Sequence, residues 1–194
     1  MKKILTAIAF VLLSCSMLNA QEGHLKIKGI PIEGNLSTFM SKLKATGLKA
    51  ASFGGVECLE GKFAGTSDCY FLFGASQTSK TVFRVAVIMP EETSWRSLKG
   101  QYESVKENYS SKYGNGRSYE WFDSPYYEGD GYEMQALKKD KCNYATFFDA
   151  PGGSIKIEIQ SWAPSAGIVL ITYEDEKGMA IAKAESNAVI DADI

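Results

Sequence analysis

The sequence predicts an α+β fold in which helices pack on one face of a meandering antiparallel sheet. A segment with helical spacing of apolar residues is followed by several strand-like segments, and the same order of elements then occurs a second time. One strand-like segment, residues 154–162, alternates apolar and polar side chains, which is typical of an antiparallel sheet with one face in water. A helix followed by a run of strands, given twice, favours the α+β class.

The first twenty residues predict export. Met1-Lys2-Lys3 are basic, residues 4–13 are apolar, and Ala20 precedes a polar residue, as a secretory signal peptide requires. We expect cleavage after Ala20, which places the mature protein in the periplasm or outside the cell. The alternative is a lipoprotein anchored through Cys15, which follows Leu12-Leu13-Ser14. We expect no transmembrane segment, because a span needs about 20 apolar residues.

Residues 21–194 suit a single domain, since domains usually contain about 100–200 residues. We divide them into unit one at about 30–90, unit two at about 91–178 and a polar tail at 179–194. The hydrophobic fraction of 45% predicts a packed core rather than disorder. The Ala-rich tail can form a helix but does not need to be ordered.

Unit one begins with a helix from Asn35 to about Thr46. Asn35 is a suitable cap and Gly47 a suitable stop. The apolar face of this helix comprises Leu36, Phe39, Met40 and Leu43. Strands are expected near residues 56–63, 69–75 and 81–89.

Unit two begins with a longer helix from Trp95 to Tyr113. Apolar residues recur at every third or fourth position, which predicts one buried face: Trp95, Leu98, Tyr102, Val105, Tyr109 and Tyr113. Thr93 or Ser94 can cap its start and Gly114 can end it. Gly100 costs about 1 kcal/mol relative to alanine, so we expect it to allow close packing on the sheet. Strands are expected near residues 118–123, 132–138, 143–149, 154–162 and 167–174.

The mature chain keeps three cysteines, Cys58, Cys69 and Cys142. Cys58 and Cys69 lie on strands joined by a turn at residues 64–67, where they are about four residues out of register. That offset exceeds the 7 Å or so between Cα atoms that a disulfide allows. We therefore expect a Cys69–Cys142 disulfide with Cys58 buried and free. The alternative is three reduced core thiols.

The residue types present disfavour several function classes. The net charge of −2 and the lack of a basic cluster argue against nucleic acid as a partner. The only histidine, His24, is close to the proposed mature start, where we expect few packed neighbours to hold it as a base or ligand. No motif of zinc hydrolases, nucleotide-binding enzymes or serine hydrolases occurs. We therefore expect no metal, no cofactor and no histidine-based catalysis.

Catalysis by carboxylates alone stays open, because a glycosidase needs only two acids about 5–10 Å apart. The candidates are Asp123, Glu128, Asp130, Glu133 and Asp149. Solvated surface acids are the simpler interpretation of the same residues.

Aromatic residues are concentrated between positions 119 and 132. The candidate ligand-binding residues in this stretch are Tyr119, Trp121, Tyr126, Tyr127 and Tyr132. Tyrosine and tryptophan combine an apolar body with a polar tip and suit the binding of a protein or a sugar. The alternative is that Trp121 and Phe122 belong to the core and that the tyrosines cover them.

The chain resembles small secreted proteins that share the tandem helix-then-sheet repeat of the beta-lactamase inhibitor protein. The residues that carry the resemblance are Gly61-Lys62-Phe63-Ala64-Gly65, Cys69, Pro90, Trp95, Leu98, Tyr102, Lys112-Tyr113-Gly114, Glu120, Phe122, Lys141-Cys142-Asn143-Tyr144, Tyr173 and Asp175. They cover most of the mature chain and imply the fold. The inhibitor has a disulfide in each repeat, which three cysteines cannot supply, so inhibition of a beta-lactamase does not carry over. The resemblance implies only that an aromatic-rich sheet face can serve for binding.

These observations together predict an exported, non-enzymatic binding module. Its ligand would be a protein or a glycan, recognised through the aromatic-rich sheet face and the loop within residues 119–132. The alternatives are a carboxylate-dependent hydrolase of envelope polysaccharide and a lipid-anchored envelope component.

Overall fold

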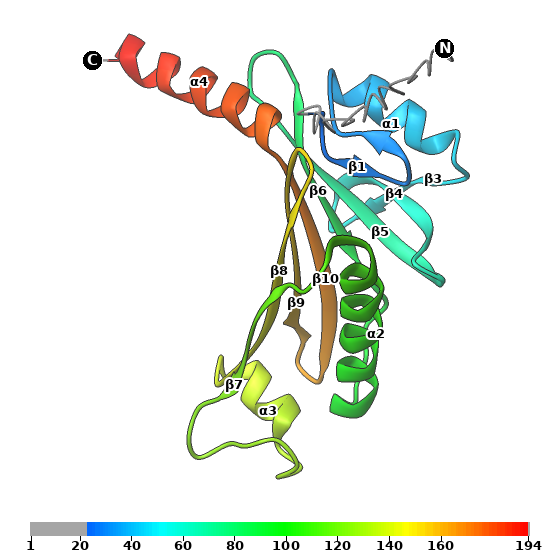
Figure 1. The fold of residues 1–194 in the computed structure, drawn as a ribbon, viewed down its shortest axis with the longest axis vertical. Helices are drawn as coiled ribbons and strands as arrows, with labels where there is room; N and C mark the ends of the chain where they lie inside the picture. Colours follow the sequence, from blue (N-terminus) through cyan, green and yellow to red (C-terminus); the bar gives the residue numbers. More distant parts are fainter. Residues whose placement is uncertain (1–22, 194) are drawn as a thin grey trace, which may run out of the picture.

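The computed structural model describes residues 23–193, which form four helices and ten strands (Figure 1). The predicted signal peptide, its cleavage after Ala20 and the alternative lipidation of Cys15 lie outside these residues. Within the described part of the chain, no helix is long and apolar enough to cross a membrane.

Eight strands form one antiparallel sheet made of two meanders. The first meander contains β3 (Lys49–Phe53), β4 (Val56–Phe63), β5 (Thr66–Ala75) and β6 (Val82–Ile88). The second contains β7 (Arg117–Phe122), β8 (Cys142–Ala150), β9 (Gly153–Ala163) and β10 (Ala166–Asp175). The strand order is β3-β4-β5-β6-β10-β9-β8-β7. At the centre of the sheet, β6, the last strand of the first meander, pairs with β10, the last strand of the second. A short hairpin of β1 (Lys26–Ile27) and β2 (Ile30–Pro31) precedes them.

The two predicted helices begin at predicted caps, and α1 ends at Lys44, slightly before the expected Thr46. In α1 (Leu36–Lys44), the side chain of Asn35 accepts a hydrogen bond from the Ser37 N–H at 3.0 Å. In α2 (Trp95–Tyr113), Ser94 is the cap, and Gly114 adopts a φ of 81° that favours glycine. The predicted tail is a helix, α4 (Glu176–Asp193), which continues from β10 and projects beyond the sheet (Figure 1).

The helices α1 and α2 lie on one face of the sheet, here called the helix face. A row of paired residues crosses five strands on this face: Phe73, Val85, Tyr173, Ile155 and Phe148. Phe39 of α1 contacts Phe73 at one end of the row, and Tyr109 of α2 contacts Phe148 at the other. The apolar stripes of the helices and this row form the core, which confirms the predicted α+β architecture.

We expected a strand at residues 132–138, but this segment contains the helix α3 (Glu133–Lys138). Its sequence, Glu-Met-Gln-Ala-Leu-Lys, consists entirely of good helix formers, and Ala136 and Leu137 provide its buried side. The edge strand β3 was not predicted, because the lysine, alanines and serine among its five residues have little β propensity.

Gly100 does not allow close packing on the sheet. It is exposed on α2, and a Cβ atom placed there would have no neighbour within 4 Å. The close approach between helix and sheet is instead at Gly167 of β10, where a Cβ would lie 2.4 Å from a Leu98 methyl group.

The predicted Cys69–Cys142 disulfide is wrong, because all three cysteines have free, buried thiols. Cys69 lies on β5 and Cys142 on β8, with β6, β10 and β9 between them. Adjacent strands are about 4.8 Å apart, so the two residues are much too far apart to pair. Cys58 is buried and free, as expected.

Candidate functional site

The face of the sheet opposite the helices, here called the open face, carries most of its exposed aromatic side chains. A row of paired residues crosses all eight strands on this face: Tyr119, Ala145, Glu158, Leu170, Ile88, Tyr70, Glu60 and Lys49. Side chains of a strand alternate between faces, so Trp121 and Phe147 also lie on the open face. Two groups of aromatic residues occupy it, one toward each edge.

The first group surrounds a hollow of about 540 Å³ over β7, β8 and β9. The residues that line this hollow are Arg117, Tyr119, Trp121, Asn143, Ala145, Phe147 and Lys156. Tyr119 is 54% exposed and Trp121 is 47% exposed, although both are large aromatic side chains. The Tyr119 ring meets Phe147 edge to face, with ring centroids 5.8 Å apart. This hollow is therefore a wide, shallow aromatic surface held by rigid strands.

The polar side chains around the hollow already have partners within the protein. Arg117 forms a bidentate ion pair with Asp149, with nitrogen–oxygen distances of 2.5 and 3.1 Å. This pair lowers the pKa of the Asp149 carboxyl group. The amide of Asn143 donates to the Tyr119 carbonyl oxygen at 2.6 Å. Lys156 pairs with Glu158 at 2.7 Å. Few polar groups are thus left to hydrogen bond a ligand, and the aromatic surface dominates the site.

The second group consists of Phe53, Tyr70 and Trp162. The Phe53 ring lies 4.9 Å from Tyr70 and 5.1 Å from Trp162, measured between ring centroids. Phe53 belongs to β3 and Trp162 to β9, with four strands between them. On a flat sheet these strands would be about 24 Å apart, at about 4.8 Å per step. The contact therefore requires the sheet to curl, which makes the open face concave at this end.

The tyrosines of the loop at residues 123–132 lie apart from these two groups. Tyr127 and Tyr132 are 64% and 60% exposed, whereas Tyr126 packs against the core and accepts a hydrogen bond from Lys139 at 3.1 Å. Asp130 orders the loop by accepting from the backbone N–H groups of Tyr127 and Tyr132. Of the five predicted residues, Tyr119 and Trp121 share the open face, and the other three belong to the loop that leads into α3.

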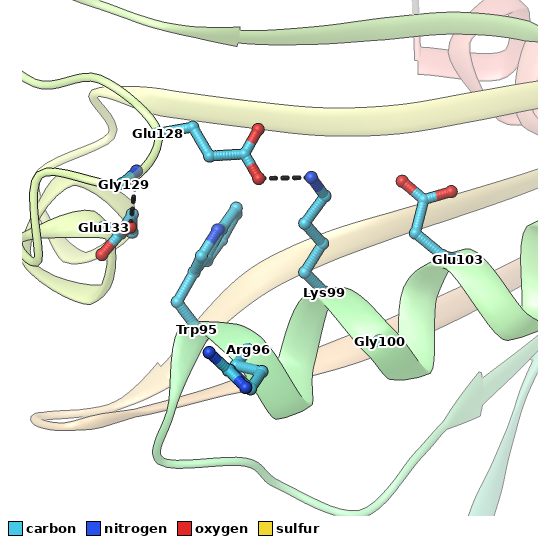
Figure 2. A pocket seen from close by; sticks show the side chains of 8 residues that line it. All are labelled: Trp95, Arg96, Lys99, Gly100, Glu103, Glu128, Gly129 and Glu133. Carbon is cyan, nitrogen blue, oxygen red and sulfur yellow. Dashed lines mark hydrogen bonds and ion pairs between the residues drawn. The ribbon is translucent and has the colours of Figure 1, made fainter.

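This loop forms a separate groove of about 540 Å³ with the first turns of α2 (Figure 2). The Lys99 ammonium forms an ion pair with Glu128 across the groove, and Glu128 also accepts from the Tyr144 hydroxyl at 3.1 Å. The hydrogen bond from Lys99 is the main reason that the pKa of Glu128 is lowered. Glu133 accepts from the Gly129 N–H at 2.8 Å.

The five candidate acids of a carboxylate-dependent hydrolase are engaged by other groups of the protein. A general acid must hold a proton, which requires a raised carboxyl pKa, and the pKa of Glu128 is lowered. Among the other candidate acids, Asp123 pairs with Lys141, Asp149 pairs with Arg117, and Asp130 and Glu133 hold the loop backbone. Each of these carboxylates therefore has a structural partner.

His24 has packed neighbours, contrary to expectation. Its Nδ1 lies 2.9 Å from the carboxylate of fully buried Asp175, and its Nε2 lies 3.6 Å from Glu33. Asp175 also accepts from the backbone N–H groups of Leu25 and Gly178, each at 2.8 Å. His24 thereby ties the N-terminal segment to the start of α4. The hollow beside it is lined by no serine, threonine or cysteine among the described residues.

No group of histidine, cysteine and acidic residues within residues 23–193 is placed to hold a metal ion. Comparison with known proteins found no matching family model, no matching curated protein and no matching solved structure. The resemblance to the beta-lactamase inhibitor protein repeat stays a prediction.

Sequence reasoning missed four aromatic residues of the open face: Phe53, Tyr70, Phe147 and Trp162. The position of Trp162 could have been predicted. It continues the alternate positions Lys156, Glu158 and Gln160, which lie on the solvent-exposed face of β9. No such signal marked Phe147, because it is adjacent to Phe148 in a strand without a regular alternation of apolar and polar residues.

Proposed function

We propose that this protein is an exported, non-enzymatic binding module whose open face recognises a protein partner. The observation that supports the proposal most directly is the exposure of Tyr119 and Trp121 beside Phe147 on a wide hollow. Isolated exposed aromatics are common, but tyrosine, tryptophan and arginine gathered on one surface are typical of the centre of a protein interface.

A protein fits this face better than a glycan. A sugar ring presents a hydroxyl group on most of its carbons, and each one needs a hydrogen-bond partner when it is buried. Arg117, Asn143 and Lys156 are engaged within the protein and offer few free partners. An apolar side chain of a partner protein can instead fill the hollow against the aromatic rings.

The second aromatic group enlarges the surface available to such a partner. The open face between the two groups has an apolar floor that includes Ile88, Ile168 and Leu170. A stable interface buries about 800 Å² on each partner. A partner seated across β3 to β7 would contact both groups, and the curl of the sheet would let it touch both at once.

Affinity capture from culture fluid and envelope extract tests the proposal. The bait is the mature protein, compared with a double variant Tyr119→Ala and Trp121→Ala. The matched control is Tyr127→Ala with Tyr132→Ala, which removes two tyrosines of the loop that are more exposed than Tyr119 and Trp121. We expect the sheet variant to lose the captured protein and the loop variant to retain it.

Thermal melts establish that both variants are folded, because exposed side chains change stability by only about 0.5 kcal/mol each. Capture of the same species by wild type and sheet variant would contradict the proposal. A glycan array is the second experiment. If the protein binds a glycan on the array only when Trp121 is present, and no protein is captured, the ligand is a sugar instead.

A further inference from the structure

A smaller hollow lies on the helix face, where the N-terminal hairpin meets the end of α2. Its volume is about 270 Å³, and both β1 and the β4–β5 turn contribute to its walls. Binding pockets of small molecules have volumes of about 300–1,000 Å³, so this hollow would suit a small ligand. It lies on the opposite side of the sheet from the hollow formed by Tyr119 and Trp121.

Two buried tyrosines line this hollow and carry one unpaired proton. Tyr109 and Tyr173 are 7% and 4% exposed, and their hydroxyl groups hydrogen bond to each other. Each hydroxyl has one proton, so the bond between them uses only one of the two. The second proton has no acceptor among the described residues. A buried donor without an acceptor is unfavourable, and an acceptor placed in the hollow would remove that penalty.

Burial keeps both hydroxyl groups protonated, because it raises the pKa of Tyr109 and of Tyr173 well above the usual tyrosine value. They are therefore hydrogen-bond donors at every pH at which the protein would operate. A hydroxyl pair with a spare donor favours an acceptor, such as a carboxylate oxygen, rather than another donor.

Three lysines surround the opening: Lys26, Lys28 and Lys112. No acidic side chain lines the hollow, and neither Lys26 nor Lys112 forms an ion pair with any described residue. The C-terminal end of α2 carries partial negative charge, which Lys112 in the last turn offsets. The opening is thus positively charged, and an anion would meet no competing carboxylate there.

Part of the wall is apolar. Phe63 and the ring of Tyr113 line the hollow beside the tyrosine pair. An inorganic anion would not cover the exposed part of these rings, whereas an organic anion would cover it and gain the free energy of burying apolar surface.

We propose that this hollow is a binding site for a small organic carboxylate. The carboxylate accepts the spare proton of the Tyr109–Tyr173 pair and lies among the three lysines, and the apolar body of the ligand packs on Phe63 and Tyr113. This site is independent of the protein partner proposed for the open face.

Titration of the full mature protein with benzoate, followed by amide NMR and calorimetry, tests the proposal. We expect saturable shifts at residues 26–28, 63–64 and 108–113. Benzamide has the same shape without the charge and should bind about tenfold more weakly, because charge-assisted hydrogen bonds are roughly twice as strong as neutral ones.

Two variants separate the charge from the hydroxyl groups. Lys26→Gln with Lys112→Gln should raise the benzoate Kd about tenfold. The charge-matched control, Lys138→Gln with Lys183→Gln, removes two lysines that do not line the hollow and should leave the Kd unchanged. Tyr109→Phe with Tyr173→Phe removes both hydroxyls together and should weaken benzoate binding while leaving the melting temperature nearly unchanged, because no orphan donor remains.

Three results would overturn the proposal. They are no saturable response to benzoate, equal binding of benzamide and benzoate, and equal binding by the two lysine double variants. The Tyr119→Ala and Trp121→Ala variant should bind benzoate normally, so failure of the protein-partner proposal would leave this one standing.

Discussion

Tyr102 connects the buried stripe of α2 to a chain of polar groups on the sheet. The residue is fully buried, and its hydroxyl donates to Glu120 at 3.0 Å and lies 2.6 Å from the Thr146 hydroxyl. Thr146 is in turn hydrogen bonded to Ser118 at 2.8 Å. One side chain thus supplies both apolar burial and the partner of a buried threonine.

Replacing Tyr102 with alanine should therefore destabilise the protein by about 3–5 kcal/mol, as large-to-small changes of buried aromatics do. Glu103→Ala, one position off the stripe, should change stability by only about 0.5 kcal/mol. Urea denaturation of both variants measures the difference. Equal shifts in the midpoint would show that the buried face of α2 is wrongly placed.

We expect replacement by alanine to change the stability of the protein in opposite directions at Gly100 and at Gly167. At Gly100 a methyl group meets no atom within 4 Å, so Gly100→Ala should stabilise α2 by about 0.4–1 kcal/mol through the lower entropy of the unfolded chain. At Gly167 a methyl group would collide with Leu98 and Leu137, at 2.4 and 2.9 Å. Gly167→Ala should therefore destabilise. Chemical denaturation curves measure the change in the free energy of unfolding for each variant. A Gly167→Ala variant that is more stable than the wild type would contradict the packing described.

At the scale of elements, one carboxylate binds α4 to the loop between β5 and β6. Glu185 accepts hydrogen bonds from the side chains of Ser76 and Ser79 and from the backbone N–H groups of Thr78 and Ser79. These bonds lower the pKa of Glu185 to about 2, with the Ser79 hydroxyl the largest contributor. The helix projects from the molecule (Figure 1), so this cluster is a main point of attachment beyond its first turn.

The contribution of Glu185 should depend on pH. Because its pKa is lower in the folded state, the attachment is complete above the unfolded value of about 4.3 and is lost as the pH falls toward 2. Hydrogen exchange of the α4 amides should accelerate, relative to the intrinsic rate, across that window. In Glu185→Gln this pH dependence should disappear; its persistence in the variant would assign the effect to another group.

At the scale of the whole molecule, the core that residues 23–193 form contains no disulfide. Cys58, Cys69 and Cys142 are buried in three different strands, and burial raises the pKa of Cys69 to about 11 and of Cys142 to about 12. Such thiols are neutral and inaccessible in the folded protein, and only the thiolate reacts readily.

Iodoacetamide should therefore label the mature protein very slowly when it is folded and at all three cysteines when it is denatured without reductant. Intact mass spectrometry counts the labels. A reducing agent should leave the melting temperature unchanged. Only one label on the denatured, unreduced protein would reveal a disulfide and contradict the structure.

Sequence alone determined the helices α1 and α2, and most of the strands that follow them. A cap, an apolar stripe and a glycine stop occur within each helix segment, so Asn35 could be assigned as one cap and the other could be narrowed to Thr93 or Ser94. The alternation in β9 likewise identified its wet face. These features depend on residues a few positions apart, which is why local patterns predict them.

Only the tertiary structure decided which distant residues meet. The pairing of β6 with β10 joins the two units and separates Cys69 from Cys142. The pairing of β7 with β8 and of β8 with β9 sets Tyr119 and Trp121 on the open face, apart from the tyrosines of the loop. The contact of His24 with Asp175 and the Tyr109–Tyr173 pair likewise join segments far apart in the chain. Strand order and curl come from long-range packing and twist, and no local pattern encodes them.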